Sequence, residues 1–319
     1  MPARTPDVSV ILVSYNTAGL LDECLARLQR ATDGIAHEFI IVDNASRDHS
    51  AELVKRRYPE HRLIENRQNV GFARAVNQAL AQASGRYALL VNTDALVEED
   101  SVAKTVAYMD AHPDCGILGA KLVYPDGRLQ PSARYFPTPW NVFLQRTGLE
   151  RFFKGVRTID DLSWDHASVR QCDWVPGCYY LVRKALIEQI GAFDPRYFLY
   201  YEEVDQCLAA KKAGWRVVCY PGTTVTHLQA QSAQTVGRLE RNTLQLEALQ
   251  IESELLYFRK NHGRAGLLAH LALTTLGDAL GLLSRLLKRR TADAAARAAH
   301  AALVWSLVGR THGGTQPTR

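Results

Sequence analysis

The sequence predicts an α/β protein with a Rossmann-like, doubly wound and mostly parallel sheet, followed by a helical C-terminal extension. Short apolar runs alternate with stretches of helical periodicity through the first half of its 319 residues. The runs are nearly unbroken, which is typical of strands buried on both faces. Repeated β-α units of this length join through right-handed crossovers into a parallel sheet.

The first β-α unit shows the pattern. Residues 8–13 (VSVILV) form an apolar strand, and in residues 20–30 three leucines, Leu21, Leu25 and Leu28, follow at helical spacing. The later units repeat it. Strands are predicted at 39–42, 62–65 and 87–91, and helices at 50–58, 72–83 and 100–112.

The following region is less regular. Strands are predicted at 116–124, 172–182 and 215–220, and a helix at 202–213. Residues 138–168 show few periodic signals, so we interpret them as an irregular lid or an acceptor-facing insertion. From Leu239 to about Arg310 the chain reads as helical. We therefore predict an α/β domain over residues 1–238 and a helical region over 239–319.

Composition narrows the class of protein. Hydrophobic residues make up 47% and charged residues 22%, which suits a globular core and excludes a disordered or fibrous chain. The net charge of +5 is too mild to indicate nucleic-acid binding, but it suits anionic lipid or phosphorylated substrates. Six scattered cysteines without a CxxC pair read as reduced core residues. No signal peptide is visible in the first residues, so we expect a cytoplasmic protein.

Polar clusters follow four predicted strands, at the edge where sheets of this class bind ligands. They are Ser14-Tyr15-Asn16, Asp43-Asn44-Ala45-Ser46, Asn69 to Arg74 with Asn77, and Asn92-Thr93-Asp94. Any one of them is equally well explained as a helix N-cap. Four together favour a binding site.

Two groups of ionisable residues are candidates for metal binding and for acid–base catalysis. Asp94 follows a buried strand with no basic neighbour in sequence, and such a carboxylate needs a partner or a cation such as Mg²⁺ or Mn²⁺. Glu202, Glu203 and Asp205 open a helix after an aromatic run. They read either as first-turn acids or as adjacent carboxylates that raise one another's pKa, which suits a general base.

The ordered motifs carry a family resemblance. They are SYN, VDNAS, NVGFARAVNQA, LLVNTD, GAKLVYPDGRLQPSAR, WVPG, IGAFDPRYFLYYEEVD and YPGTTVTH. Over about residues 7–262 the chain resembles the inverting GT-A glycosyltransferases of family 2, in the bacterial rhamnosyltransferase-like branch. The resemblance implies transfer of a sugar, with rhamnose favoured, from a dTDP- or UDP-linked donor. The implied acceptor is a glycan or lipid-linked hydroxyl in cell-surface polysaccharide synthesis.

The resemblance also implies residue roles. Asp43 accepts from the donor's pyrimidine base, Asn16 lies beside the nucleoside, and Arg74 and Asn77 approach the diphosphate or ribose. Ser14 and Asn44 complete the donor-binding set. Asp94 and His227 hold the metal, and Asn92 stands where many relatives carry the first Asp of the DxD-type element. Trp174 and Gly177 line the donor sugar and acceptor. Glu203 is the catalytic base, with Glu202 and Asp205 as the nearby acids.

The sequence of the helical C-terminal region is compatible with more than one kind of partner. Residues 265–287 are long enough to cross a bilayer, but Asp278 lies near the middle, which costs roughly 2.5–3.5 kcal/mol on insertion scales. One polar stripe and the flank Lys288-Arg289-Arg290 favour a helix lying at a membrane surface. The alternative is a helix packed on its own domain or in a homodimer.

Two other functions remain as alternatives. A nucleotidyltransferase also uses a parallel sheet and a metal, but it carries a basic Gly-rich loop after the first strand, which SYNTAG lacks. The second alternative is a non-catalytic nucleotide-sugar-binding protein.

Overall fold

The computed structural model describes residues 5–153, 155–161, 164–228 and 239–319. By contacts, the described chain divides into two compact units. The first, here the sheet unit, comprises residues 1–134, 162–195 and 202–242, and the second, here the helical unit, comprises 135–161, 196–201 and 243–319. The predicted domain boundary, residue 238, lies outside the described residues, so that division stays a prediction.

The sheet unit holds one mixed sheet. Its principal strands are β1 (Val8–Ser14), β2 (His37–Asp43), β3 (Arg62–Glu65), β4 (Tyr87–Val91), β6 (Cys115–Val123), β9 (Tyr179–Arg183) and β10 (Arg216–His227). The short strands are β5 (Ala95–Val97), β7 (Leu129–Gln130) and β8 (Arg170–Gln171). The order is β3-β2-β1-β4-β9-β6-β10-β5. Neighbours from β3 to β4 are parallel, as are β6 and β10, while β9 runs antiparallel between β4 and β6.

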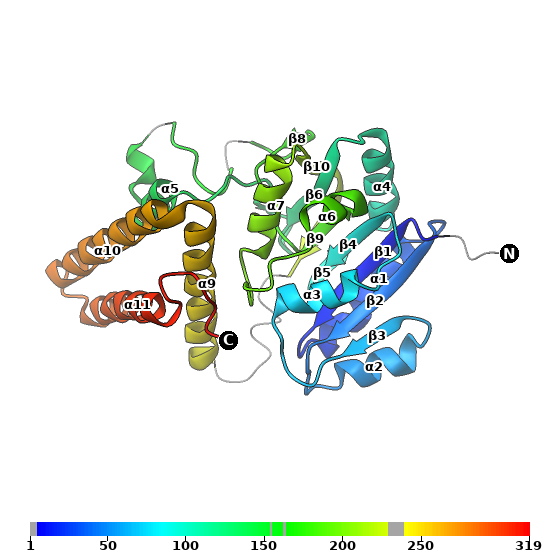
Figure 1. The fold of residues 1–319 in the computed structure, drawn as a ribbon, viewed down its shortest axis with the longest axis horizontal. Helices are drawn as coiled ribbons and strands as arrows, with labels where there is room; N and C mark the ends of the chain where they lie inside the picture. Colours follow the sequence, from blue (N-terminus) through cyan, green and yellow to red (C-terminus); the bar gives the residue numbers. More distant parts are fainter. Residues whose placement is uncertain (1–4, 154, 162–163, 229–238) are drawn as a thin grey trace. The chain divides into compact units, whose positions relative to one another are not determined.

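Helices cover both faces of this sheet (Figure 1). On one face lie α1 (Ala18–Ala31), α2 (Ser50–Arg57) and α4 (Ser101–Ala111), whose apolar side chains share a core with alternate residues of the central strands. On the other face lie α3 (Phe72–Leu80), α6 (Lys184–Ile190) and α7 (Glu202–Lys212). The strands are therefore buried on both sides, which explains their nearly continuous apolar sequences.

The sequence-based elements agree with most of this sheet. The predicted strand at 172–182 is wrong in part, because a loop containing Trp174 and Gly177 separates β8 from β9. The prediction of an irregular segment at 138–168 is also wrong in part, because α5 (Pro139–Thr147) and the short 3₁₀ helix η1 (Leu149–Phe152) lie there. Thr138 and Asn141 form a capping box at the start of α5. Thr138, Pro139 and Gly148 were therefore the available helix signals.

The helical unit contains α5, α9 (Leu239–Asn261), α10 (Gly263–Leu287) and α11 (Thr291–Arg310), and α10 packs on both α5 and α11. The polar stripe of α10 faces inward. Its Asp278 is buried, accepts from His300 Nδ1 at 2.8 Å and pairs with Arg297. Leu267 and Leu271 are buried with this stripe, whereas six other leucines of α10 lie on the exposed side. By length and composition, α10 is also the one helix among the described residues that is able to cross a membrane.

Candidate active site

The loops after β1 and β2 meet at the carboxyl edge of the sheet. The strands are in register, with Ser14 opposite Asp43, so the residues that follow them emerge side by side. The backbone N–H of Asn16 donates to Ser46 Oγ at 3.0 Å, and Asn16 Oδ1 accepts from the N–H of Arg47 at 2.7 Å. Asn16 has a positive φ of 56°, which turns the chain sharply after the strand.

Asp43 presents one unused acceptor at this edge. The residue is 5% exposed, and its Oδ2 accepts from the backbone N–H of Ser46 at 3.0 Å. Its Oδ1 is buried and has no hydrogen-bond partner. An unpaired buried acceptor is costly, so Oδ1 is suited to a donor that a ligand brings.

Three of the predicted donor-binding residues make hydrogen bonds within the protein. Asn44 Oδ1 accepts from the N–H of Val70 at 3.0 Å, which ties the end of β2 to the loop before α3. Asn77 donates to Phe193 O at 2.7 Å, and Arg74 Nε donates to Pro195 O at 3.1 Å. These contacts hold the loops of the site in place. Contact of the three side chains with the donor stays a prediction.

Asp94 and His227 lie together at the same edge. Strand β10 pairs with β5, placing His227 opposite Ala95, and the N–H of Leu228 donates to Asp94 O at 2.9 Å. His227 Nε2 is 3.4 Å from Asp94 Oδ1. The amide of Gln130 contacts the other ring nitrogen, Nδ1, with its oxygen at 3.2 Å. When Nδ1 carries the proton and donates to Gln130, Nε2 has a free lone pair facing the carboxylate.

This pair fits a divalent cation held partly by substrate. Two neighbouring ligands of an octahedral Mg²⁺ or Mn²⁺ lie roughly 3 Å apart, given metal–ligand distances near 2.1 Å. Asp94 and His227 therefore match two adjacent positions. No group of three or more His, Cys, Asp or Glu residues able to hold a metal is found in the described part of the chain. The remaining ligands would then come from diphosphate oxygens and water, as is usual for such ions.

The loop before β9 lies next to this pair. The N–H of Asn92 donates to Cys178 O at 3.3 Å, which places Gly177 and Cys178 beside the strand end that carries Asp94. A Cβ built on Gly177 would meet no atom within 4 Å, so open space lies in front of it. Trp174 is buried, and the guanidinium of Arg134 lies 4.9 Å from its ring centroid.

The acid pair opens α7. Oε2 of Glu202 and Oε2 of Glu203 are both buried without a hydrogen-bond partner. Burial, together with the charge of Glu203, raises the pKa of Glu202 well above its usual range. Burial also raises the pKa of Glu203, against the lowering effect of backbone N–H groups, including that of Gly177, and of the Arg134 charge. Asp205 is also buried. Because it lies two residues further along α7, its side chain points away from the side of the helix that carries Glu203.

Several contacts thus bring predicted residues together at the carboxyl edge of the sheet. Asp94 contacts His227, Asn92 contacts the Gly177–Cys178 turn, and that turn hydrogen-bonds Glu203. Two further residues were missed from the sequence, Arg134 and Gln130. Arg134 belongs to a quoted motif, GAKLVYPDGRLQPSAR, but no spacing rule singles it out. Gln130 lies on a two-residue strand that periodicity cannot reveal.

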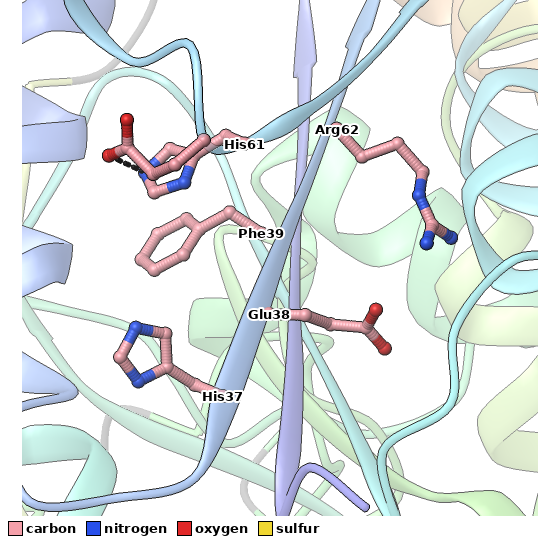
Figure 2. Close-up of a pocket in the computed structure, with 6 residues that line it drawn as sticks. His37, Glu38, Phe39, His61 and Arg62 are labelled. Carbon is pink, nitrogen blue, oxygen red and sulfur yellow. Dashed lines mark ion pairs between the residues drawn. The ribbon is translucent and has the colours of Figure 1, made fainter. Parts of the chain in front are cut away.

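A pocket of about 470 Å³ lies at the opposite edge of the sheet (Figure 2). It is lined by His37, Glu38, Phe39, Glu60, His61 and Arg62. The ring of Phe39 stacks on His61 at 4.3 Å, and the lining residues start β2 and β3 or precede β3. Because ligands of parallel sheets bind beyond the carboxyl ends of strands, this pocket is separate from the candidate site.

Comparison with known families decides the class. Residues 9–166 match the family described as glycosyl transferase family 2. The protein is a glycosyltransferase, and its residues 9–166 form a domain of this family. The predicted α/β architecture is confirmed as the GT-A fold. A mannosyltransferase, PcManGT from Pyrobaculum calidifontis in complex with GDP-Man and Mn²⁺, aligns over 98% of this chain and 88% of its own, with a TM-score of 0.56 at 18% identity.

Two other proteins are similar to this glycosyltransferase. One is N-acetylglucosaminyl-diphospho-decaprenol L-rhamnosyltransferase of Mycobacterium tuberculosis, which is 28% identical over 256 residues, covering 72% of this chain and 78% of the relative. The other is S. aureus TarS 1-349 in complex with UDP, with a TM-score of 0.50 at 17% identity, covering 98% of this chain and 93% of that one. The rhamnosyltransferase-like resemblance seen in the motifs is therefore confirmed.

Proposed function

We propose that this glycosyltransferase moves a sugar, with rhamnose favoured, from a dTDP- or UDP-linked donor to a hydroxyl of a glycan or lipid-linked acceptor. The observation that carries the proposal is the proximity of the Asp94–His227 pair and of Glu203, whose Oε2 is buried, to the Gly177–Cys178 turn. The printed name of the mycobacterial relative combines a lipid-linked acceptor with rhamnose, which supports both choices. The corresponding role is bacterial cell-surface polysaccharide synthesis.

Asp43 is the base-reading residue in this proposal. Its free Oδ1 is an acceptor, and the N3–H of uracil or thymine is a donor, so the two are complementary. Asn16 lies in the neighbouring loop and approaches the nucleoside, with Ser14 beneath it at the end of β1. Arg74 and Asn77 lie on α3 toward the diphosphate or ribose.

Asp94 and His227 would hold the divalent ion, Mg²⁺ or Mn²⁺, which when bound offsets the negative charge that grows on the departing diphosphate. Asn92 lies beside the diphosphate. Trp174 and the open space at Gly177 receive the sugar and the acceptor.

Glu203 acts as the general base. Its carboxylate removes the proton of the acceptor hydroxyl while that oxygen bonds to the anomeric carbon. The bond from the anomeric carbon to the diphosphate oxygen breaks in the same step, which inverts the configuration. A buried carboxylate with a raised pKa is a stronger base than an exposed one, which suits this role. Glu202 and Asp205 are the neighbouring acids able to take the role instead.

The test is turnover of Glu203→Gln. A thermal-shift screen of nucleotide sugars with Mn²⁺ identifies the donor, and release of nucleoside diphosphate measures turnover. We expect Glu203→Gln to bind the donor normally and to lose about 10²–10⁴-fold in kcat. The isosteric Glu202→Gln is the matched control. Near wild-type turnover of Glu203→Gln refutes its role as base, and no nucleotide release by the wild type identifies a non-catalytic binding protein.

We further propose that α10 lies on the inner face of the cell membrane, which makes the protein cytoplasmic and peripheral. Its exposed side carries six leucines at 45–77% exposure: Leu268, Leu276, Leu280, Leu283, Leu286 and Leu287. The exposed turn Lys288-Arg289-Arg290 follows directly, and Trp305 of α11 is also exposed. An apolar helix face with a basic flank suits an anionic lipid surface. The buried pairing of Asp278 favours lying on the bilayer over crossing it.

Flotation with vesicles containing anionic phosphatidylglycerol tests this surface. We expect the double variant Leu280→Gln/Leu283→Gln to lose vesicle binding. Phe152→Ser is the control, because Phe152 is 67% exposed on η1, outside α10. Unchanged flotation of the double variant contradicts the proposal. A variant that changes molecular mass in solution instead identifies α10 as a homodimer contact.

A further inference from the structure

Arg134 is fixed to the loop that precedes β9 by backbone pairing within the sheet unit. Its N–H donates to Trp174 O at 3.1 Å, and the N–H of Trp174 donates back to Arg134 O at 3.1 Å. Gly177 follows Trp174 by three residues in the same loop. The backbone of Arg134 is therefore held close to the open space in front of that glycine.

The side chain of Arg134 covers the ring of Trp174. The guanidinium carbon lies 4.9 Å from the centroid of the indole, a distance typical of a cation that rests on an aromatic face. Trp174 is only 6% exposed, whereas Arg134 is half-buried. A ligand in this part of the site therefore meets the guanidinium first, and the indole ring supports it.

Helix α7 anchors the same loop. Lys211 Nζ donates to Asp173 Oδ1 at 2.5 Å and to Cys172 O at 3.2 Å. The N–H of Asp173 in turn donates to Arg134 O at 3.0 Å. The helix that begins with the acid pair thus also holds the segment that pairs with Arg134, and all of these residues belong to the sheet unit.

The charge of Arg134 reaches the proposed base. It acts to lower the pKa of Glu203, against the raising effect of burial. It acts in the same direction on the Cys178 thiol, whose pKa is raised by burial and by the charge of Asp94. A guanidinium carries five N–H donors in a planar fork, more than a bidentate pair with one carboxylate uses. Attraction to Glu203 therefore leaves donors for a second anion.

The proposed mechanism indicates which substrate supplies that anion. In a single displacement, the departing diphosphate and the attacking hydroxyl lie on opposite sides of the anomeric carbon. The diphosphate belongs with the Asp94–His227 pair, and the hydroxyl belongs with Glu203. Because the charge of Arg134 acts on Glu203, we assign its ligand to the acceptor rather than to the donor.

We propose that Arg134 is an acceptor-binding residue, and that its ligand is a phosphate group attached to the sugar whose hydroxyl is glycosylated. The inference rests on the proposed role of Glu203 as base, and it narrows the proposed acceptor to an anionic, phosphate-linked sugar. A guanidinium fork matches two phosphate oxygens with parallel hydrogen bonds, a geometry that an ammonium group does not reproduce.

The test compares two acceptors that differ in charge, with dTDP-rhamnose as donor and Mn²⁺ as metal. One is a short-chain lipid diphosphate of N-acetylglucosamine, the acceptor type named for the mycobacterial relative, and the other is neutral octyl N-acetylglucosaminide. We expect Arg134→Gln to raise the KM of the diphosphate acceptor about 10- to 100-fold and to leave the KM of dTDP-rhamnose and of the neutral acceptor unchanged. Arg134→Lys keeps the charge but not the fork, so it is expected to restore only part of this affinity.

The rates are measured on the upper plateau of each pH profile, where Glu203 is ionised in every variant. This separates acceptor binding from the effect of Arg134 on the base. An equal rise in KM for both acceptors, or a rise confined to dTDP-rhamnose, overturns the proposal.

A binding measurement completes the test without turnover. The protein is saturated with UDP and Mn²⁺, which fill the donor side, and is titrated with N-acetylglucosamine 1-phosphate in a calorimeter. We expect Arg134→Gln to weaken this binding at least about tenfold, with UDP affinity and melting temperature as in the wild type. Equal affinity of the two proteins, or no binding by the wild type, overturns the role of Arg134. Binding that depends on Arg134 in a protein that transfers no sugar refutes the proposed function and leaves the phosphate site in place.

Discussion

His227 Nε2 lies 3.4 Å from Asp94 Oδ1, although the two residues are far apart in the sequence. The antiparallel pairing of β10 with β5 brings them together. Gln130, on the short strand β7, fixes the far side of the imidazole ring. The pair therefore depends on a third residue that contacts no ligand in the proposed mechanism.

Removal of that third residue is expected to weaken metal use. In Gln130→Ala the imidazole loses the hydrogen bond that orients its Nε2, and such supports typically contribute about 10–100-fold to metal affinity. We expect the Mn²⁺ concentration for half-maximal turnover to rise by that factor, with kcat at saturating Mn²⁺ nearly unchanged. Gln130→Glu, which still accepts from Nδ1, is the control. An unchanged Mn²⁺ dependence in Gln130→Ala contradicts the assignment.

Substitution of the base-reading carboxylate is expected to reduce pyrimidine affinity. Asp43→Asn removes the charge from a buried acceptor, and a hydrogen bond to a charged group is worth about 1.5–3 kcal/mol. We therefore expect UDP to bind about 10- to 100-fold more weakly by calorimetry. ADP serves as the comparison, because its base carries no N3–H donor. Equal weakening of UDP and ADP shows that Asp43 acts on the fold rather than on the base.

The pH profile is expected to report the environment of Glu203. The proposed base works as a carboxylate, so kcat/KM falls as pH drops through its raised pKa, at higher pH than for an ordinary glutamate of pKa near 4.3. The Arg134 charge lowers that pKa, so Arg134→Met is expected to move the acidic fall to still higher pH. Arg134→Lys keeps the charge and leaves it nearly in place. A profile in Arg134→Met that matches the wild type excludes this coupling.

Gly119 within β6 and Gly177 in the loop before β9 are expected to respond differently to substitution by alanine. A Cβ on Gly119 would lie 2.6 Å from Val175 Cβ, so Gly119→Ala is expected to destabilise the fold by about 1–3 kcal/mol in urea unfolding. Gly177→Ala adds a methyl group to open space, so its stability stays within about 0.5 kcal/mol of wild type while turnover falls. Wild-type turnover of Gly177→Ala means that the sugar does not occupy this space.

Many residues at the sheet edge could be predicted from the sequence, because local patterns show where each strand ends. Strands such as 62–65 and 87–91 are bounded by polar residues, and those residues emerge at one edge by the geometry of parallel pairing. Asp94 and Asp43 were found in this way. The contact between Asp94 and His227 required the position of β10, which depends on long-range pairing rather than on local pattern.

Other features had no usable local signal. The short strands β5 and β7 are too brief for any period, so the support of His227 by Gln130 was invisible. The polar stripe of α10 was recognised, but its direction was not. A residue such as Asp278 is polar whether it faces water or the arginine and histidine of a neighbouring helix, and only the packing of the helices decides between the two.

The six cysteines, Cys24, Cys115, Cys172, Cys178, Cys207 and Cys219, are all free and buried, and all belong to the sheet unit. Alkylating reagents attack thiolates, and burial raises the pKa of every one of these thiols. Each thiol is therefore protected from alkylation in two ways: the reagent cannot reach it, and it stays protonated. The protein thus carries a built-in reporter: iodoacetamide uptake follows the opening of the sheet unit and does not register fraying confined to the C-terminal helices.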